Sequence, residues 1–259
     1  KNITDTAMMR FMRILEKKHH LELPDYGALH AWSIQSPDLF WEAIADFFDI
    51  KFNTPPTCIL NQAEHMIDAK WFPNATFNIT EHLLKRTDAH PALICLNETG
   101  ERDVLSYKAL RQQVADCAAG LRAHGIQSGD RVAGMLPNSA FSIIAMLATA
   151  SIGAIWSICS PDFGLTAAVD RFSQITPKLL LACDGYTYHG KRYVLKDKAE
   201  ALRTAIPSIQ QLVMCPVLNH QALPAAALQW DDFLVPNAAF QTTPHAFDHP
   251  WYILFSSGT

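Results

Sequence analysis

From residue 131 onward the chain alternates between short apolar runs and longer stretches with helical spacing, and this alternation limits its possible folds. Apolar runs of strand length lie at 131–136, 154–158, 178–182 and 211–214, with helical patterns between them. Strands that alternate with helices in this way pair in parallel through right-handed crossovers. The sequence therefore predicts an α/β fold, a layered parallel sheet with flanking helices.

The segment before residue 77 follows a different pattern. Residues 5–18 predict an amphipathic helix, and Ser36 followed by Pro37 marks the start of a second helix. Between and after these helices we expect irregular structure, because prolines recur there. We therefore expect a mostly helical attachment over residues 1–76 and the first part of a larger α/β domain over residues 77–259.

Local signals after residue 77 predict further elements. The run from Asn78 to Glu81 resembles a capping box that opens a short helix. Residues 92–96 and 104–106 flank a turn sequence and are expected to pair as a hairpin. Ser106 is then expected to cap a long helix.

Residues 138–161 contain no charged side chain, and this length approaches that of a membrane-spanning helix. However, Gly153 interrupts the run, serine and threonine recur within it, and no Lys or Arg lies at its immediate edges. A buried helix that is followed by a buried strand accounts for the same residues. We favour this second interpretation and expect no membrane association.

Charge and cysteine content narrow the range of functions. The formal net charge is -4 and no Lys/Arg-rich run is present, which argues against a nucleic-acid binder. The six cysteines are dispersed without a C-x-x-C pair, which is typical of reduced, mostly buried thiols in a cytoplasmic protein. His245 and His249 are flanked by prolines, so we expect no helical metal pair and no metal site. None of these features indicates an oligomeric state.

The last residues, from Trp251 onward, change from an apolar run to small hydroxyl and glycine residues. The apolar run predicts a buried strand. A loop that holds phosphate through backbone N–H groups and hydroxyls is predicted at Ser256, Ser257, Gly258 and Thr259. A plain strand-to-turn transition explains the same residues. No Lys or Arg occurs from residue 204 onward, so a triphosphate there needs Mg²⁺ or cations from elsewhere.

Ligands of open parallel sheets bind at the carboxyl ends of the strands. Three of the predicted loops, 137–138, 159–164 and 256–259, follow predicted strands and therefore fall at that edge. We expect these loops to contribute to one shared site.

Several motifs together resemble the adenylate-forming acyl-CoA synthetases. The end of the chain is similar to the start of their phosphate loop, which continues as Thr-Gly-x-Pro-Lys. Residues 159–164 (Cys-Ser-Pro-Asp-Phe-Gly), with 170–172 (Asp-Arg-Phe), resemble acetoacetyl-CoA synthetases, whereas acetyl-CoA synthetases carry Gly-Gly-Phe-Ser. Residues 71–73 (Trp-Phe-Pro) and 184–191 fit the same family, and the resemblance covers nearly the whole chain.

The resemblance implies an ATP-dependent, AMP-forming acid–thiol ligase. Its reaction would convert acetoacetate, ATP and CoA, with Mg²⁺, to acetoacetyl-CoA, AMP and diphosphate through an acyl-adenylate. The family's pattern implies that the loop from Ser256 to Thr259 contacts ATP phosphates and that Gly190 and Lys191 bind CoA phosphates. Phe163 would lie near the CoA channel. The alternatives are a solvated surface lysine for Lys191 and a core aromatic for Phe163.

In the family, the catalytic lysine and the acyl pocket would lie beyond Thr259. We therefore expect no catalytic residue among residues 1–259, and we expect that an N-terminal fragment ending there is inactive. Two alternatives stay open. One is a related ligase for acetate or propionate, which the 159–164 run disfavours. The other is a non-catalytic nucleotide- or CoA-binding module that ends at Thr259.

Overall fold

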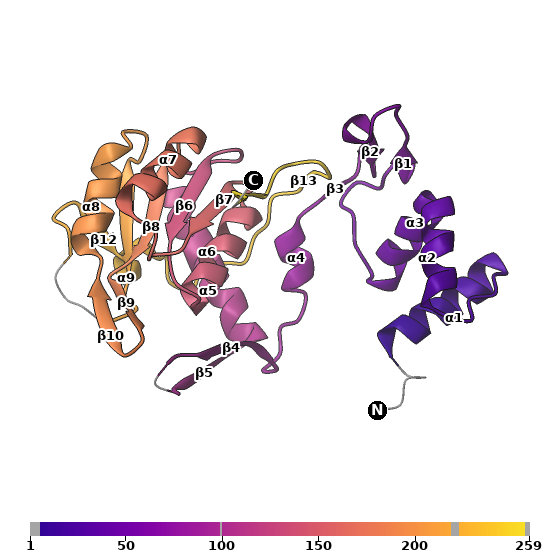
Figure 1. Ribbon diagram of the computed structural model, residues 1–259, viewed down its shortest axis with the longest axis horizontal. Coiled ribbons are helices and arrows are strands. Elements are labelled where there is room, and N and C mark those ends of the chain that lie inside the picture. The colour runs from indigo at the N-terminus through magenta and orange to yellow at the C-terminus, as the bar shows by residue number, and fades with distance from the viewer. Residues whose placement is uncertain (1–5, 99, 219–222, 257–259) are drawn as a thin grey trace. The chain divides into compact units, whose positions relative to one another are not determined.

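The computed structural model describes residues 6–98, 100–218 and 223–256, and the chain divides into two compact units. The first unit comprises residues up to Phe77 together with His245–Asp248. The second unit comprises Asn78–Pro244 and the residues from His249 onward. Figure 1 shows the helical elements of the first unit in indigo to purple and the sheet of the second unit in magenta to yellow.

Three helices enclose a small apolar core in the first unit. They are α1 (Ala7–His19), α2 (Tyr26–Gln35) and α3 (Pro37–Phe47). The ring of Phe11 lies 6.0 Å from that of Phe40 and 5.2 Å from that of Phe47, in edge-on contacts. Helices α1 and α3 confirm the two predicted helices, and α3 begins at Pro37 as expected.

Helix α2 lies where we expected irregular structure, so that expectation was wrong. The Asp25 carboxylate accepts a hydrogen bond from the Ala28 N–H (2.9 Å) and caps the helix. Leu29 is the buried residue of α2, and its other apolar residues do not gather on one face. The helical period was therefore too weak to be seen in the sequence.

Short elements complete the first unit. They are β1 (Leu60–Asn61), the 3-10 turn η2 (Met66–Asp68), β2 (Lys70–Trp71), β3 (Thr76–Phe77) and β13 (His245–Ala246). Strand β1 pairs with β2, and β3 pairs with β13, both antiparallel. Rings from this region pack together, with the centroid of Phe247 4.8 Å from Phe72 and 5.6 Å from Phe77.

A six-stranded sheet in the order β12-β11-β8-β6-β7-β14 forms the centre of the second unit. Its strands are β6 (Arg131–Met135), β7 (Ile155–Cys159), β8 (Leu179–Cys183), β11 (Gln211–Cys215), β12 (Ala227–Gln229) and β14 (Tyr252–Ile253). Every pair of neighbouring strands in it is parallel. The predicted α/β fold with a layered parallel sheet is confirmed.

Alternate residues of the central strands face two separate apolar cores. On β8, Leu179, Leu181 and Cys183 belong to one core, whereas Leu180 and Ala182 belong to the other. The covering helices are α5 (Tyr107–Ala123), α6 (Ala140–Ser151), α7 (Leu165–Ile175) and α8 (Lys196–Ala205). Helices α5 and α6 cover the first core, and α7 and α8 cover the second, on the opposite face of the sheet (Figure 1).

The uncharged segment 138–161 forms α6 and β7, as the favoured interpretation predicted. Most of α6 is buried in the first core. No helix within the described ranges has both the length and the apolar character that crossing a bilayer requires.

Helix α4 (Ile79–Leu83) begins at Asn78, but only part of the predicted capping box is formed. The Asn78 side-chain oxygen accepts from the Thr80 N–H (2.9 Å), while its amide nitrogen donates to three backbone carbonyls of distant segments. Glu81 instead accepts from the Thr242 hydroxyl (3.1 Å). Asn78 therefore connects the start of α4 to distant backbone segments, while the Glu81 carboxylate bonds to Thr242.

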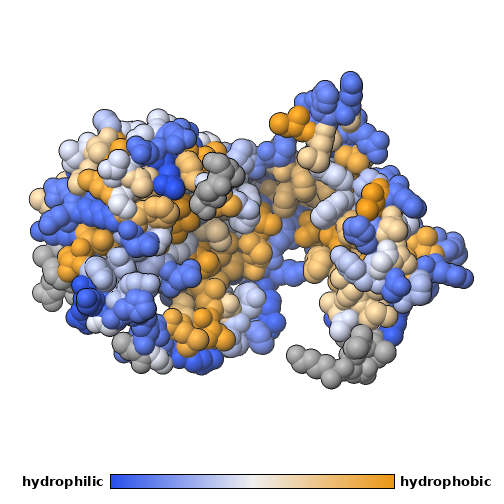
Figure 2. Space-filling view, in the orientation of Figure 1, coloured by the Kyte–Doolittle hydropathy of each residue, from blue (hydrophilic) through white to orange (hydrophobic). Residues whose placement is uncertain are grey.

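The predicted hairpin is confirmed as β4 (Pro91–Leu96) and β5 (Arg102–Ser106). Ser106 then caps α5 by accepting from the Ala109 N–H (3.2 Å), as predicted. The hairpin strands are mostly apolar, and they expose Ile94 (54%) and Leu96 (69%). Figure 2 shows hydrophobic surface over this part of the molecule.

Four elements of the second unit were not predicted from the sequence, one of them the sheet strand β12. The other three are β9 (Gly185–Tyr188), β10 (Lys191–Val194) and α9 (Trp230–Phe233). Strands β9 and β10 form a separate antiparallel hairpin, and α9 contributes Trp230 and Phe233 to the first core.

The predicted buried strand near the end of the chain is instead the short edge strand β14, so its expected burial was wrong. Tyr252 is 40% exposed and Leu254 is 69% exposed. The Trp156 N–H donates to the Trp251 carbonyl (2.9 Å), and the Ser157 hydroxyl donates to the Ile253 carbonyl (3.0 Å). These bonds attach β14 to β7, while its other edge carries no strand of the described chain.

Candidate functional site

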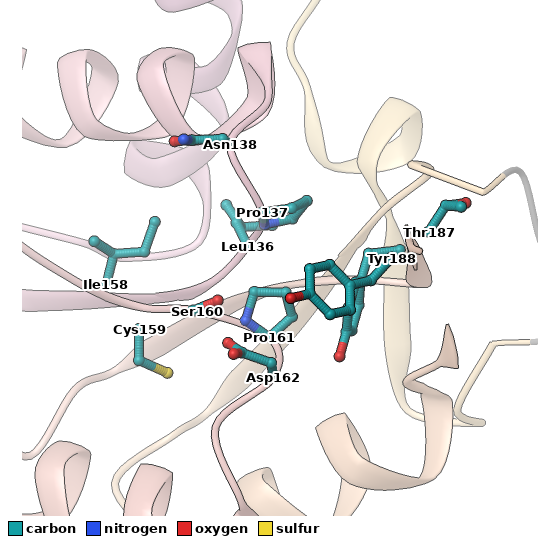
Figure 3. A pocket seen from close by; sticks show the side chains of 11 residues that line it. Leu136, Pro137, Asn138, Ile158, Cys159, Ser160, Pro161, Asp162, Thr187 and Tyr188 are labelled. Carbon is teal, nitrogen blue, oxygen red and sulfur yellow. The ribbon is translucent and has the colours of Figure 1, made fainter. Parts of the chain in front are cut away.

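A pocket of about 570 Å³ opens in the second unit where β6 and β7 end (Figure 3). Its wall consists of residues 136–138 after β6, residues 158–162 at the end of β7, and residues 186–188 in β9. The first two segments belong to loops that the sequence predicted at the carboxyl ends of strands. The β9 segment was not predicted to take part, although its alternating tyrosines could have indicated a strand.

The strand that leads to the third predicted loop, β14, ends at the same edge of the sheet. Strands β6, β7 and β14 are consecutive and parallel, so their carboxyl ends are neighbours. Ser256 is exposed and does not line the pocket. The remaining residues of the predicted phosphate loop, Ser257, Gly258 and Thr259, lie outside the described residues.

Side chains from the covering helices fix the two pocket loops. The Ser142 hydroxyl in α6 donates to the Pro137 carbonyl (2.6 Å). On the other side, the Lys198 ammonium in α8 donates to the Pro161 carbonyl (2.7 Å). In Figure 3, Pro137 and Pro161 enter the pocket from their separate loops, with Asp162 next to Pro161. The pocket shape therefore depends on the packing of α6 and α8 against the sheet.

Phe163 does not line the pocket. It is half-buried and packs against the second core, and the Arg171 guanidinium lies over its ring, 4.5 Å from the centroid. Its N–H donates to the Ser160 carbonyl (3.2 Å), which turns the chain into α7. In this structure Phe163 holds the pocket loop against the core.

Gly190 and Lys191 lie at the tip of the β9–β10 hairpin and are exposed. Lys191 pairs with Tyr188 across a two-residue turn made by His189 (φ 48°) and Gly190 (φ 72°). Positive φ at both positions is what a type I′ turn requires, and glycine adopts it without strain. Neither Gly190 nor Lys191 lines the pocket. Tyr188, which pairs with Lys191 in the same hairpin, does line it, so both residues lie beside the pocket.

The base of the same hairpin is fixed by a buried acid. The Asp184 carboxylate, only 2% exposed, accepts from the N–H groups of Val217 and Leu218 (both 2.8 Å). At Gly185 a Cβ atom would collide with the Tyr193 carbonyl and with the Leu218 side chain, so a larger residue does not fit. These contacts tie the β9 wall of the pocket to the loop after β11.

The pocket itself carries no cation. Among the described residues that line it there is no Lys or Arg, and Asp162 is its acidic side chain. Burial raises the pKa of the Tyr186 phenol, and the nearby Asp162 raises it further. Tyr186 also stacks on Tyr193, with centroids 5.1 Å apart and planes at 15°. The lining therefore suits a neutral, partly apolar group better than a phosphate chain.

Cys159 is not poised as a nucleophile. Burial raises the pKa of its thiol to about 11, although Lys198 and Arg171 act in the opposite direction. The thiol therefore stays protonated at neutral pH. All six cysteines are free, and four are buried, in agreement with the sequence prediction. Within the described ranges, no three His, Cys, Asp or Glu side chains gather in a way that would hold a metal ion.

Comparison with family models supports the α/β interpretation. Residues 80–259 match the model described as AMP-binding enzyme, and residues 26–83 match the model described as acetyl-coenzyme A synthetase N-terminus. Among solved structures, the chain resembles the acetoacetyl-CoA synthetase from Streptomyces lividans with a TM-score of 0.94 and 39% identity. That match covers 99% of this chain and 40% of the solved one.

Curated relatives give the same result. An acetoacetyl-coenzyme A synthetase from Rhizobium meliloti (strain 1021) is 40% identical, and an acetoacetyl-CoA synthetase from Mus musculus is 36% identical. A malonamoyl-CoA synthetase, vrtB, from Penicillium aethiopicum is 35% identical. Each match covers 98% of this chain, which spans 40% of the first two relatives and 38% of the third. Because the AMP-binding enzyme model matches well over half of its residues, the chain belongs to the AMP-binding enzyme family.

Proposed function

We propose that the chain is the N-terminal part of an acetoacetate–CoA ligase. The observation that carries this proposal is the similarity of 98% of the chain to acetoacetyl-CoA synthetases at up to 40% identity. The pocket loop at 159–164 supports it, because that run is the one that resembles these synthetases in particular. The six free cysteines, four of them buried, support a cytoplasmic location.

The proposed reaction has two steps. The acetoacetate carboxylate attacks the α-phosphate of ATP, which forms acetoacetyl-adenylate and releases diphosphate. The CoA thiolate then attacks the acyl carbon and releases AMP, so the thiol proton goes to solvent or a base. Both steps bring anions together, so catalysis depends on positioning and on charge stabilisation by cations.

The charge distribution supports a division of CoA between two surfaces. The pocket lacks cations and suits the neutral pantetheine arm, whereas Lys191 and Arg192 on the neighbouring hairpin are exposed cations that suit phosphates. Gly190 would allow close approach of a phosphate to the turn. We propose that Phe163 acts indirectly, by holding the 159–164 loop in place rather than by touching CoA.

ATP phosphates would bind at the loop from Ser256 to Thr259, next to the carboxyl ends of β6 and β7. Mg²⁺ would arrive with ATP as part of the substrate. We assign it no protein ligand, since the described residues offer no cluster of acidic side chains for it. We also propose residues 1–76 as the attachment typical of short-chain acyl-CoA synthetases and 77–259 as the first part of the adenylation domain.

Acid-dependent exchange between ATP and diphosphate tests the proposal in the full-length protein. We expect exchange with acetoacetate to exceed exchange with malonamate, acetate or propionate. Greater exchange with malonamate, which shares the 3-carbonyl group, would contradict acetoacetate as the substrate and favour the acid that the name of the Penicillium ligase indicates. Greater exchange with acetate would contradict the assignment of the 159–164 run. Absence of exchange with every acid, despite nucleotide binding, would favour a non-catalytic binding module.

Lys191 gives a test of the CoA assignment. Lys191→Glu in the full-length protein should raise the apparent KM for CoA and leave acid-dependent exchange intact, because exchange precedes CoA binding. Lys108→Glu is a matched control, since it makes the same charge change at an exposed position of α5. An unchanged CoA requirement would make Lys191 a solvated surface residue.

A further inference from the structure

The turn of the β9–β10 hairpin already holds a carboxylate from another segment. The His189 N–H donates to Oε1 of Glu98 (3.1 Å), and the Gly190 N–H donates to Oε2 of the same side chain (3.2 Å). Glu98 belongs to the turn between β4 and β5, so the tips of two hairpins meet, as Figure 1 shows. Successive N–H groups that each hold a carboxylate oxygen form an anion-binding concavity.

The hairpin geometry explains why these two N–H groups face an anion. The pair that flanks the turn, Tyr188 and Lys191, belongs to the ladder between β9 and β10. The two turn residues have positive φ and lie outside that ladder. Their N–H groups therefore point away from the strands and are available to an acceptor from elsewhere.

A phosphate would be a stronger occupant than Glu98. Phosphate carries more negative charge than a carboxylate and three acceptor oxygens. The exposed side chains of Lys191 and Arg192 follow directly in β10 and add positive charge to this tip. Glu98 is itself exposed, so solvent compensates its departure and the carboxylate can leave at low cost.

We infer that Glu98 is a tethered competitor for a phosphate group at the β9–β10 turn. A phosphate-bearing ligand binds there only after the carboxylate leaves, so Glu98 weakens the apparent affinity for that ligand. The inference rests on the proposed function insofar as CoA is the ligand. A free phosphate ion would have the same chemistry, and the experiment therefore separates the two sources.

Titration calorimetry on the full-length protein tests this inference with Glu98→Gln and a matched control, Asp103→Asn. Asp103 is an exposed acid in β5, so its substitution removes the same charge from the same hairpin. We expect Glu98→Gln to lower the Kd for CoA roughly twofold to fivefold, the range for exposed charged contacts, with the control within about 1.5-fold. The inference would be overturned if all three proteins had the same Kd for CoA and also shared the same Kd for inorganic phosphate.

Two further ligands identify the phosphate. If Glu98→Gln lowers the Kd for CoA but not for dephospho-CoA, the turn binds the 3′-phosphate. If it lowers the Kd for both, the turn binds the diphosphate. A gain for inorganic phosphate alone keeps Glu98 as a competitor but makes the free ion the ligand.

Amide hydrogen exchange provides a readout that does not need CoA. Without ligand, the His189 and Gly190 amides should exchange faster in Glu98→Gln than in the unsubstituted protein or in Asp103→Asn. Addition of inorganic phosphate should restore their protection. If CoA binds none of the proteins while this pattern persists, the proposed function fails and the inference about Glu98 stands. Identical exchange in all three proteins would refute the Glu98 contact itself.

Discussion

The two segments expected to meet at the site are anchored very differently. The 159–164 loop follows β7, which pairs with β6 over five residues, and its Pro161 carbonyl is held by Lys198. The segment that leads to the predicted phosphate loop follows β14, which pairs with β7 over two residues and lies at the edge of the sheet. The first is supported by two cores. The second is held by a few bonds to one neighbouring strand and by Ile253 and Phe255, which pack against the second core while only partly buried.

This difference predicts that one part of the site loses its structure only on global unfolding, whereas the other part can open locally. The pocket loops are held in position by the most buried part of the second unit, so their geometry should persist until that unit unfolds. The β14 segment adds only partly buried side chains to the second core, so local opening there should cost less than opening of the central strands. Substitutions behind the pocket should therefore act on global stability, and substitutions along β14 should act on local protection.

The largest expected effect comes from the core behind the pocket loop. Phe172 in α7 is fully buried in the second core. Phe172→Ala should lower the free energy of unfolding by about 3–5 kcal/mol, because it removes a buried ring and leaves a cavity. Leu254→Ala, at an exposed position after β14, should change it by less than about 0.5 kcal/mol. Urea denaturation measures both, and equal losses would remove the contrast.

A smaller effect is expected at the base of the β9–β10 hairpin. Asp184→Ala would leave the N–H groups of Val217 and Leu218 without their carboxylate acceptor. We expect a loss of about 1–3 kcal/mol, since each unmet buried donor costs stability. Denaturant unfolding measures the loss, and hydrogen exchange should show deprotection of residues 185–194. The exposed acid Asp103, changed to Ala, is the control and should leave both unchanged.

The anchor of β14 should give a local effect. Ser157→Ala removes the hydroxyl that donates to the Ile253 carbonyl, at a cost of about 1 kcal/mol. Because β14 is an edge strand, exchange should accelerate at residues 251–255 more than at β6 or β8. If β8 became deprotected to the same degree, β14 would be part of the cooperative core and the contrast would be wrong.

The smallest effect concerns the thiol at the pocket. Since the pKa of Cys159 is raised to about 11, its thiolate fraction below that pH falls about tenfold for each unit of pH. Alkylation of Cys159 at pH 7 should therefore be slow and should accelerate as the pH approaches 11. Peptide mass spectrometry can follow it, with the exposed Cys58 as the reference for accessibility. Rapid labelling at pH 7 would show an activated thiolate.

Sequence patterns that act within a few residues predicted much of the fold. Ser106 caps α5, Pro37 opens α3, and the apolar runs at β6, β8 and β11 form strands, because capping and burial act within a few residues. The β9–β10 hairpin escaped prediction because its turn residues, His189 and Gly190, do not form a common hairpin signature. Strand β14 was predicted as buried because its apolar residues do not reveal which neighbours cover them.

The site was predictable in part. Strand order brings the loops after β6 and β7 together, and parallel topology alone indicates that arrangement. Contacts between distant segments, such as Lys198 with Pro161 or Glu98 with Gly190, leave no local pattern in the sequence. Phe163 illustrates the limit, since its packing on the core and under Arg171 could not be read from the motif that contains it.

Filling the pocket in the full-length protein tests the central claim most directly. Ser160 lines the pocket and is exposed, so Ser160→Trp should obstruct the pocket without disturbing a core. The control is Ser173→Trp, at an exposed position of α7 outside the pocket. If the pocket receives CoA, Ser160→Trp raises the apparent KM for CoA at least about tenfold, the effect of about 1.4 kcal/mol of lost binding, and leaves acid-dependent ATP–diphosphate exchange intact. An unchanged KM for CoA in Ser160→Trp would contradict the account.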